Sequence, residues 1–532
     1  MTMTTSKYKL IISVLLGFLI AISSCTEDLN VEPLDDDVVT PEDVYQDADS
    51  YRQVLAKLYA GLSLTGQEGP AGNPDIQGID EGFSNYLRQY WVAQEIPTDE
   101  AVVAWSDPGL PAFNTQSWDA SNDFIMALYS RIFYQITSCN EFIRESEDGK
   151  LNERGFSDSE KEKIRQFRAE ARFLRAFSYW HAMDLYRNIP FITEDDEVGA
   201  FYPEQIDPVD LFDYLEKELQ DIENELVDSK SNEYGRVDQA AAWTLLAKLY
   251  LNAEVYTGQK YYTEAITYAK KVIDESGYAL EDNYEHLFLA DNETADGIIF
   301  PITFDGRSSE TYGGTNFIIH AAVGGDMDPD DYGVDGGWGG HRVTPEFVNL
   351  FPSDDSDQRK MFFTSGQTLE IDDVSDFRQG YAVEKFKNIN RSGEPGKDLE
   401  FVDTDFPVFR LADVYLMYAE AVVRGGEGGS IGDAVDYVNE IRQRAYGDNS
   451  GDITNDDLDL EFILEERGRE LYWEGHRRTD LVRYEFYTGG DYVWAWKGDS
   501  KDGSSTDSYL NIYPIPDSDI NANPELEQND NY

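Results

Sequence analysis

The sequence contains very little cysteine, histidine or positive charge for its length. Among 532 residues there are two cysteines, five histidines and 43 lysines or arginines, against 104 aspartates and glutamates. Two cysteines, Cys25 and Cys139, exclude a disulfide framework, and the histidines lack the close spacing of a zinc site. A net charge of −61 at pH 7 argues against nucleic acid as a partner, because its phosphates would be repelled.

Membrane-spanning apolar runs and common catalytic motifs are also missing. The apolar run Leu10–Ile22 has 13 residues, whereas a helix that crosses a bilayer needs about 20. The sequence has no GxSxG, no Walker A motif and no GxGxxG that opens a βαβ unit. An aromatic content of 13% argues against disorder for most of the chain.

Residues 1–24 have the features of a secretory signal, with two lysines, the apolar run and two small serines in that order. The sequence ISSC at 22–25 resembles a bacterial lipobox, in which Ile22 replaces the usual leucine. This resemblance predicts that Cys25 is lipidated and anchors the mature chain. The alternative is an ordinary signal peptide followed by an incidental cysteine. Glu27 and Asp28 resemble the export signal that places such lipoproteins on the outer face of the membrane.

The rest of the chain divides into an acidic tether, residues 25–46, and one domain, residues 47–532. Apolar periodicity predicts that the domain is mostly α-helical, with a long helix at 160–187 and another at 208–227. Two helix pairs, 241–256 with 261–276 and 409–424 with 431–446, have small residues where the helices would cross. This pattern is typical of tetratricopeptide-like repeats. The segments at about 64–120 and 290–405 are rich in Gly, Pro, Asn and Asp, which predicts long irregular insertions.

Several stretches identify the chain as similar to the SusD/RagB family of outer-membrane glycan-binding lipoproteins. These stretches are AEARFLRAFSYW (169–180), FRLADVYLMYAEA (409–421), VNEIRQRA (438–445), ILEERGRELYWEGHRRTDLVR (463–483) and NIYPIPDSDINANPELEQN (511–529). Others resemble the family's starch-binding founder, namely 64–82, 95–105, 250–259, 311–315 and 491–498. The resemblance implies a helical scaffold of about four tetratricopeptide-like pairs with a little β structure. It further implies glycan capture at the cell surface, a SusC-like TonB-dependent transporter as partner, and no catalysis or cofactor.

The chemistry of sugar recognition agrees with aromatic residues in the irregular segments, because flat rings stack on the CH faces of sugars. By resemblance, the starch-binding residues of the founder correspond to Arg88, Trp105, Tyr312 and Trp338. Two further positions differ, since a tryptophan is replaced by Val103 and an asparagine by Pro108. These differences predict a glucan site of altered curvature, which leaves starch and a β-1,3-glucan of the laminarin type both open. Further site residues are predicted from their places in the same segments, with Asp80, Glu81 and Asn316 preferred over Trp91, Asn114 and Trp118.

Three other interpretations of the sequence stay open. Asp291, Glu293 and Asp296 cluster after a predicted helix and could hold a structural Ca²⁺, although a solvated turn is the simpler interpretation. The mixed charges of ELYWEGHRRTD, residues 470–480, are interpreted as structural pairs on a solvated helix rather than as an acid–base set. A secreted glycoside hydrolase on a helical scaffold is the alternative function, because 104 acidic residues can conceal a catalytic carboxylate pair.

Overall fold

The computed structural model describes residues 41–199 and 201–532. The chain forms two compact units, of which the first ends at Ser50 and the second spans Tyr51–Tyr532. The signal segment 1–24 and Cys25 lie outside the described residues. Among the helices that are described, none is both long enough and apolar enough to cross a membrane.

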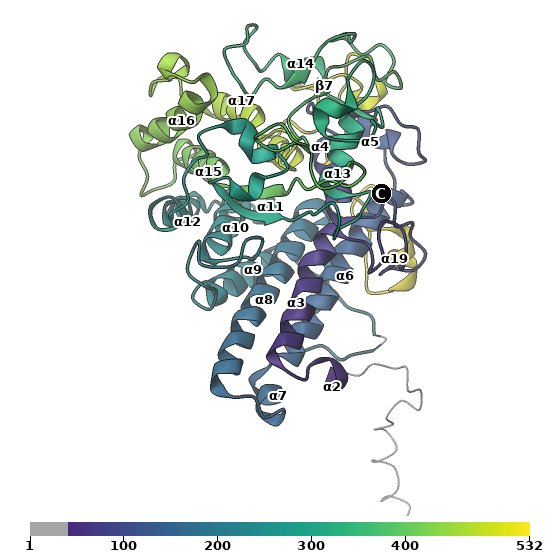
Figure 1. Ribbon diagram of the computed structural model, residues 1–532, viewed down its shortest axis with the longest axis vertical. Coiled ribbons are helices and arrows are strands. Elements are labelled where there is room, and N and C mark those ends of the chain that lie inside the picture. Colours follow the sequence, from purple (N-terminus) through teal and green to yellow (C-terminus); the bar gives the residue numbers. More distant parts are fainter. Residues whose placement is uncertain (1–40, 200) are drawn as a thin grey trace, which may run out of the picture. The chain divides into compact units, whose positions relative to one another are not determined.

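Helices make up most of the regular structure (Figure 1). In chain order the helices are α2 (Pro41–Val44), α3 (Ala48–Ser63), α4 (Tyr86–Glu95), α5 (Pro111–Thr115), α6 (Asp123–Glu145), α7 (Asp148–Glu153), α8 (Asp158–Tyr186), α9 (Pro208–Ile222), α10 (Gln239–Leu251), α11 (Ala253–Thr257), α12 (Tyr262–Glu275), α13 (Gly314–Ala322), α14 (Pro345–Val348), α15 (Leu411–Val423), α16 (Ile431–Tyr446), α17 (Leu460–Leu471), α18 (Arg477–Arg483) and α19 (Asp517–Ala522). The predicted mostly α fold is confirmed.

The two longest helices, α6 and α8, pack side by side in the lower part of Figure 1. A capping box begins α8, since the Ser157 side chain accepts from the Glu160 backbone N–H and the Glu160 carboxylate accepts from Ser157. The helix predicted at 160–187 is therefore confirmed. The one predicted at 208–227 is α9, which begins with the predicted Pro208 but ends at Ile222, earlier than its apolar pattern suggests.

The predicted helix pairs correspond to α10 with α12 and to α15 with α16, and the two helices of each pair pack against each other. Helix α12 also packs on α15, so the two pairs share one scaffold. At these crossings Ala265, Ala269, Ala434 and Ala445 are fully or almost fully buried. Their small side chains allow the helix backbones to approach, which is the packing expected of tetratricopeptide-like pairs.

Strands are short, and those in the described residues form four two-stranded antiparallel sheets. The pairs are β1 (Val102–Val103) with β5 (His341–Arg342), β2 (Ile189–Pro190) with β3 (Gln205–Ile206), β4 (Ile298–Ile302) with β8 (Phe406–Arg410), and β6 (Phe362–Phe363) with β7 (Ala382–Val383). In the first sheet Val102 pairs with Arg342 and Val103 with His341. This sheet therefore brings two distant segments of the chain together.

Four α-helices, α4, α5, α13 and α14, occur inside the segments that the sequence predicts to be irregular, and the two longest are α4 and α13. Helix α4 lies in the first and α13 in the second, and they pack against each other. Nearly every residue of α4, and every residue of α13, is buried. A helix that is covered on all sides shows no polar face, so its sequence lacks the period that predicts an amphipathic helix.

The interior contains a network of ion pairs that links segments far apart in sequence. Arg477 bonds Asp99 with 2.7 and 2.6 Å contacts, and Arg478 donates to Asp184 at 2.9 Å. All four side chains are at most 5% exposed. The charges in 470–480 are thus structural, but the prediction of a solvated helix face is wrong. Burial of the two arginines is tolerated because each has an opposite charge on a distant segment of the chain.

Candidate functional site

Three half-buried aromatic side chains form a cluster that we call the aromatic face: Trp105, Trp338 and Tyr312. The ring centres of Trp105 and Trp338 are 6.4 Å apart, with 46° between the ring planes. Those of Trp338 and Tyr312 are also 6.4 Å apart, with 64° between the planes. The structure therefore brings these three predicted residues together and leaves part of each ring exposed.

The sheet of β1 and β5 places Trp105 beside Trp338. The pairing continues beyond the strands, because the Ala104 backbone N–H donates to the Gly340 carbonyl at 2.9 Å. Beyond it, the Trp105 indole Nε1–H donates to the Trp338 carbonyl at 3.1 Å. The Trp105 ring is thus fixed to the backbone of the segment that carries Trp338.

Glycine at position 340 is required by the position of the Trp105 ring. A Cβ atom on Gly340 would lie 2.6 Å from Cζ2 of Trp105, closer than real Cβ contacts. The indole therefore lies directly on the backbone of this glycine. At Gly336, in the same glycine-rich segment, a Cβ atom would meet no other atom within 4 Å, so a glycine is not required at every position of the segment.

Helix α13 supports both Trp338 and Tyr312. Backbone N–H groups of Trp338, Gly339 and Gly340 donate to carbonyls at the end of α13, at 2.7, 2.9 and 2.8 Å. These bonds satisfy carbonyl groups that a helix end leaves without partners. Tyr312 directly precedes Gly313, the N-cap residue of α13, so one helix sets the positions of two rings of the aromatic face.

Arg88, on α4, holds the Tyr312 backbone. Its Nη1 donates to the carbonyls of Tyr312 at 3.0 Å and Gly82 at 2.8 Å, and the guanidinium lies 4.3 Å above the Phe317 ring. Burial lowers the pKa of Arg88 to about 10, which Asp107 and then Asp80 partly oppose, so the side chain stays charged at neutral pH. Arg88 therefore links α4 to the aromatic face.

One acidic side chain, Glu400, contacts the aromatic face, and two predicted acids, Asp80 and Glu81, lie in the loop before Arg88. The Tyr312 hydroxyl donates to the Glu400 carboxylate at 3.2 Å. Asp80 is exposed, and its carboxylate accepts from the Gly82 backbone N–H at 2.8 Å, while Glu81 is half-buried. Carboxylates accept hydrogen bonds from hydroxyl groups, so these acids suit a ligand rich in hydroxyls.

Four other predicted residues are buried and are not part of this surface. The Asn316 side chain is 1% exposed, so it does not contact a molecule on the aromatic face. Trp91 and Trp118 are core residues, and Asn114 bonds both backbone groups of Val103. Their burial follows from the all-round packing of this region, which residue type alone does not reveal.

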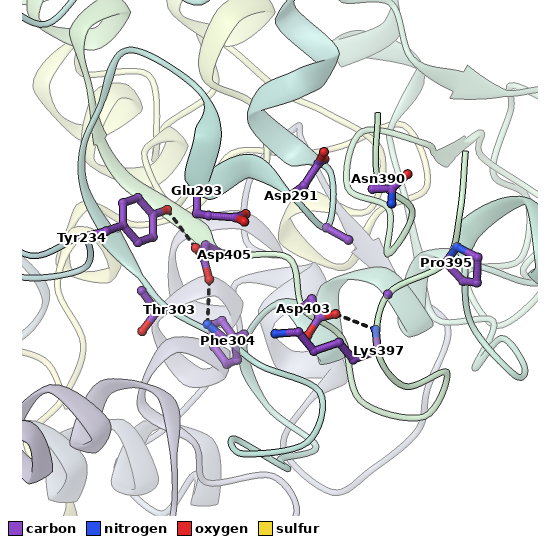
Figure 2. Close-up of a pocket in the computed structure, with 12 residues that line it drawn as sticks. Tyr234, Asp291, Glu293, Thr303, Phe304, Asn390, Pro395, Lys397, Asp403 and Asp405 are labelled. Carbon is purple, nitrogen blue, oxygen red and sulfur yellow. Dashed lines mark hydrogen bonds and ion pairs between the residues drawn. The ribbon is translucent and has the colours of Figure 1, made fainter. Parts of the chain in front are cut away.

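The three acids of the predicted calcium cluster are not brought together. Asp296 forms an ion pair with Lys230 at 2.7 Å. Asp291 and Glu293 instead line a cavity of about 490 Å³ whose wall also includes Asp403 and Asp405, as Figure 2 shows. In the two described ranges, no three acidic, histidine or cysteine side chains are grouped as metal ligands.

The same cavity contains an ordered hydrogen-bond chain. The Tyr234 hydroxyl donates to Asp405 at 2.8 Å, and Asp405 also accepts from the Phe304 backbone N–H at 2.7 Å (Figure 2). Burial raises the pKa of Asp405 to about 7, and those two hydrogen bonds oppose the shift. None of the three rings of the aromatic face lines this cavity.

Several residues that shape the aromatic face are not predicted from the sequence. Gly340, His320 and Glu400 contact its rings, but none belongs to a recognisable motif. The glycine-rich run around Trp338, GGWGG, is the one available signal. It indicates close backbone packing without identifying the partner.

Comparisons with known proteins agree with this geometry. The model of the SusD family matches residues 373–532. The starch-binding protein SusD of Bacteroides thetaiotaomicron is 35% identical to this chain, over 96% of each protein.

Solved structures share the fold at lower identity. A laminarin-binding SusD-like protein is 22% identical with a TM-score of 0.70, covering 92% of this chain and 100% of its own. Surface glycan-binding protein A of Bacteroides thetaiotaomicron, in complex with laminarihexaose, is 20% identical with a TM-score of 0.69, covering 90% and 99%. At these identities the similarity establishes the fold.

Proposed function

The chain belongs to the SusD family, and from this premise we propose that it binds a glucan on its aromatic face without catalysing a reaction. The observation that carries the proposal is the grouping of Trp105, Trp338 and Tyr312 as partly exposed residues, with the Glu400 carboxylate bonded to Tyr312. Rings supply stacking surfaces for the CH faces of sugars, and the carboxylates accept from their hydroxyls.

The tilt between the rings favours a curved glucan. A ligand stacked on Trp105, Trp338 and Tyr312 in turn must follow plane changes of 46° and 64°. A flat, straight chain cannot lie on all three rings, whereas α-1,4- and β-1,3-glucans curve. We therefore propose a starch-like or laminarin-like glucan, in keeping with the ligands named for the similar proteins.

The proposed cellular role follows from the predicted lipid anchor. With Cys25 lipidated, the protein would be held on the outer face of the outer membrane, where it captures glucan. It would then deliver the glucan to a SusC-like TonB-dependent transporter. The acidic segment 25–46, predicted from the sequence to be a tether, would separate the anchor from the domain, which suits a lid that moves over a transporter.

An affinity-gel panel tests the proposal. We expect the soluble domain to be retarded in gels with amylose or laminarin and to migrate freely with a straight β-1,4-glucan. Trp338→Ala should reduce the retardation, whereas Tyr202→Ala, which removes a 60% exposed ring outside the aromatic face, should not. Free migration in every gel would refute glucan binding.

A reducing-end assay tests the hydrolase alternative with the same glucans. Glu474, one of the acids in the charge cluster 470–480, is buried and paired with Lys385 and Arg410, both at 2.6 Å. We therefore expect no new reducing ends. Sustained release of them would show that the protein is an enzyme.

Calcium binding remains a separate prediction, and the proposed function does not depend on it. Asp291 and Glu293 at the cavity of Figure 2 are the residues in question. If Ca²⁺ binds there, CaCl₂ should raise the melting temperature of the wild type but not that of Asp291→Asn. Equal melting curves with CaCl₂ and with EDTA would exclude a structural calcium ion.

A further inference from the structure

His320, on α13, lies beneath the aromatic face and contacts Trp338 ring to ring. The ring centres are 4.8 Å apart and the planes are 18° apart, so the imidazole is stacked on the indole. Only 1% of His320 is exposed. Trp338 therefore has one face on this buried ring, which supports the indole from below.

Both ring nitrogens of His320 face backbone carbonyl oxygens. Nδ1 is 2.8 Å from the oxygen of Gly336, and Nε2 is 3.1 Å from the oxygen of Glu400. A neutral imidazole has one N–H and one lone pair, so it donates to only one of these carbonyls. The protonated ring donates to both.

The two carbonyls belong to the segments that carry or contact the exposed rings. Gly336 is two residues before Trp338, and the Glu400 side chain accepts from the Tyr312 hydroxyl at 3.2 Å. His320 thus contacts Trp338 directly and Tyr312 through Glu400. One buried side chain lies at the junction of two rings that a bound glucan would need in a fixed arrangement.

We propose that His320 is a positioning residue that sets the arrangement of Trp338 and Tyr312, and that its protonation strengthens glucan binding. The inference rests on the proposed function, because it concerns the affinity of the same aromatic face. Protonation adds the second hydrogen bond, which fixes the 336 and 400 segments to one ring. Loss of the proton leaves one of these segments without its bond.

The charges around His320 set the pH range. Burial lowers the pKa of His320 below its usual 6.5, while the Gly336 carbonyl, Asp335 and the backbone and side chain of Glu400 oppose this shift. The other α13 residues next to it, Ile319 and Ala321, are uncharged. Because the folded-state pKa is lowered, the ring is neutral at pH 7.5 and takes up its proton as the pH falls below 6.5. Affinity should therefore rise toward acidic pH.

Glucan affinity at pH 5.5 and 7.5 tests the proposal, using the soluble domain and laminarin or amylose. For the wild type we expect binding about two- to tenfold tighter at pH 5.5, the range that one net hydrogen bond supplies. His320→Phe keeps a flat ring under Trp338 but has no donor, so it should bind more weakly than the wild type at pH 7.5, where the neutral imidazole still donates one hydrogen bond, and its affinity should change little with pH. His286→Gln is the matched control, because this half-buried histidine pairs with Glu281 away from the aromatic face.

A measurement without glucan separates this inference from the proposed function. A protonated imidazole quenches the fluorescence of an indole stacked on it, so acidification should lower the emission of the wild type and of His286→Gln. The drop should be reduced in both His320→Phe and Trp338→Phe. If His320→Phe fails to fold, the comparison of the wild type with Trp338→Phe still shows whether His320 is protonated beneath Trp338.

The outcomes are distinct. A wild type that binds no glucan refutes the proposed function, while the fluorescence titration still shows whether His320 is protonated under Trp338. Wild-type binding that His320→Phe leaves unchanged at both pH values overturns the positioning role. A fluorescence drop that is equal in all four proteins overturns the protonation.

Discussion

Replacing Gly340 by alanine should displace the Trp105 ring without changing Trp105 itself. The added methyl carbon would lie 2.6 Å from Cζ2 and 2.7 Å from Cε2 of the indole. Ordinary carbon contacts begin near 3.5 Å, so the overlap is about 0.9 Å. Since the ring is rigid, Trp105 must tilt or leave its place on the segment 338–340.

The expected loss of affinity follows from the surface that one ring offers. A tryptophan buries about 150–250 Å² when it is fully enclosed, so a sugar on one partly exposed face covers roughly 60–100 Å² of it. At about 25 cal/mol per Å² this contact contributes about 1.5–2.5 kcal/mol. Its loss weakens glucan binding by about 10- to 70-fold. Loss of the hydrogen bond from Trp105 to the Trp338 carbonyl should weaken glucan binding further.

Isothermal calorimetry with laminarin or amylose measures this change, with Gly336→Ala as the matched control. That position has free space for a methyl group and lies in the same glycine-rich run, so its affinity should equal that of the wild type. Thermal melts confirm that both variants fold. If folded Gly340→Ala bound as tightly as Gly336→Ala, Trp105 would not be a stacking surface and the site would be misplaced.

Three further outcomes are expected. Trp91→Ala should destabilise the fold by about 3–5 kcal/mol in urea unfolding, because Trp91 is fully buried. Trp105→Ala should reduce glucan affinity at nearly unchanged stability. If instead Trp91→Ala reduced affinity and Trp105→Ala reduced stability, Trp91 would be the binding residue and Trp105 the core residue. Burial raises the pKa of Glu95, next to Glu100, to about 7. The protonated carboxyl therefore stabilises the fold below pH 4.5, and this stability, about 3 kcal/mol at most, is lost as the pH rises to 7. Glu95→Gln should reduce the resulting fall in melting temperature between pH 5 and 7.5. Cys25→Ala should release the protein from the membrane fraction without changing the glucan affinity of the soluble form, and retention in the membrane would contradict lipidation.

The sequence predicts the parts of the fold that alternate between buried and exposed faces. Helices α12 and α16 have such faces, and their predicted positions agree with the structure within one residue at each end. Helices α4 and α13 do not, because they are enclosed. A pattern that depends on a contrast between two faces cannot reveal an element that has only one environment.

The aromatic face shows the same limit. Resemblance selects Trp105, Tyr312 and Trp338, and the structure groups them, but residue type alone does not separate them from the buried Trp91. The contacts of His320 are not predictable at all, since they join α13 to carbonyls at positions 336 and 400. Such contacts depend on tertiary geometry between segments that are irregular in sequence.

The buried ion pairs have a consequence for how much of the chain is needed to obtain a folded protein. Arg477 and Arg478 lie within residues 373–532, the part that the family model matches, whereas Asp99 and Asp184 lie in the first half of the chain. A fragment limited to 373–532 would contain both cations without these partners, and a broken buried pair costs about 3–5 kcal/mol. The matched segment is therefore not an autonomous module. Cloning it alone should yield insoluble or protease-sensitive material, and a chain truncated before Arg477 during synthesis should fail to complete its interior.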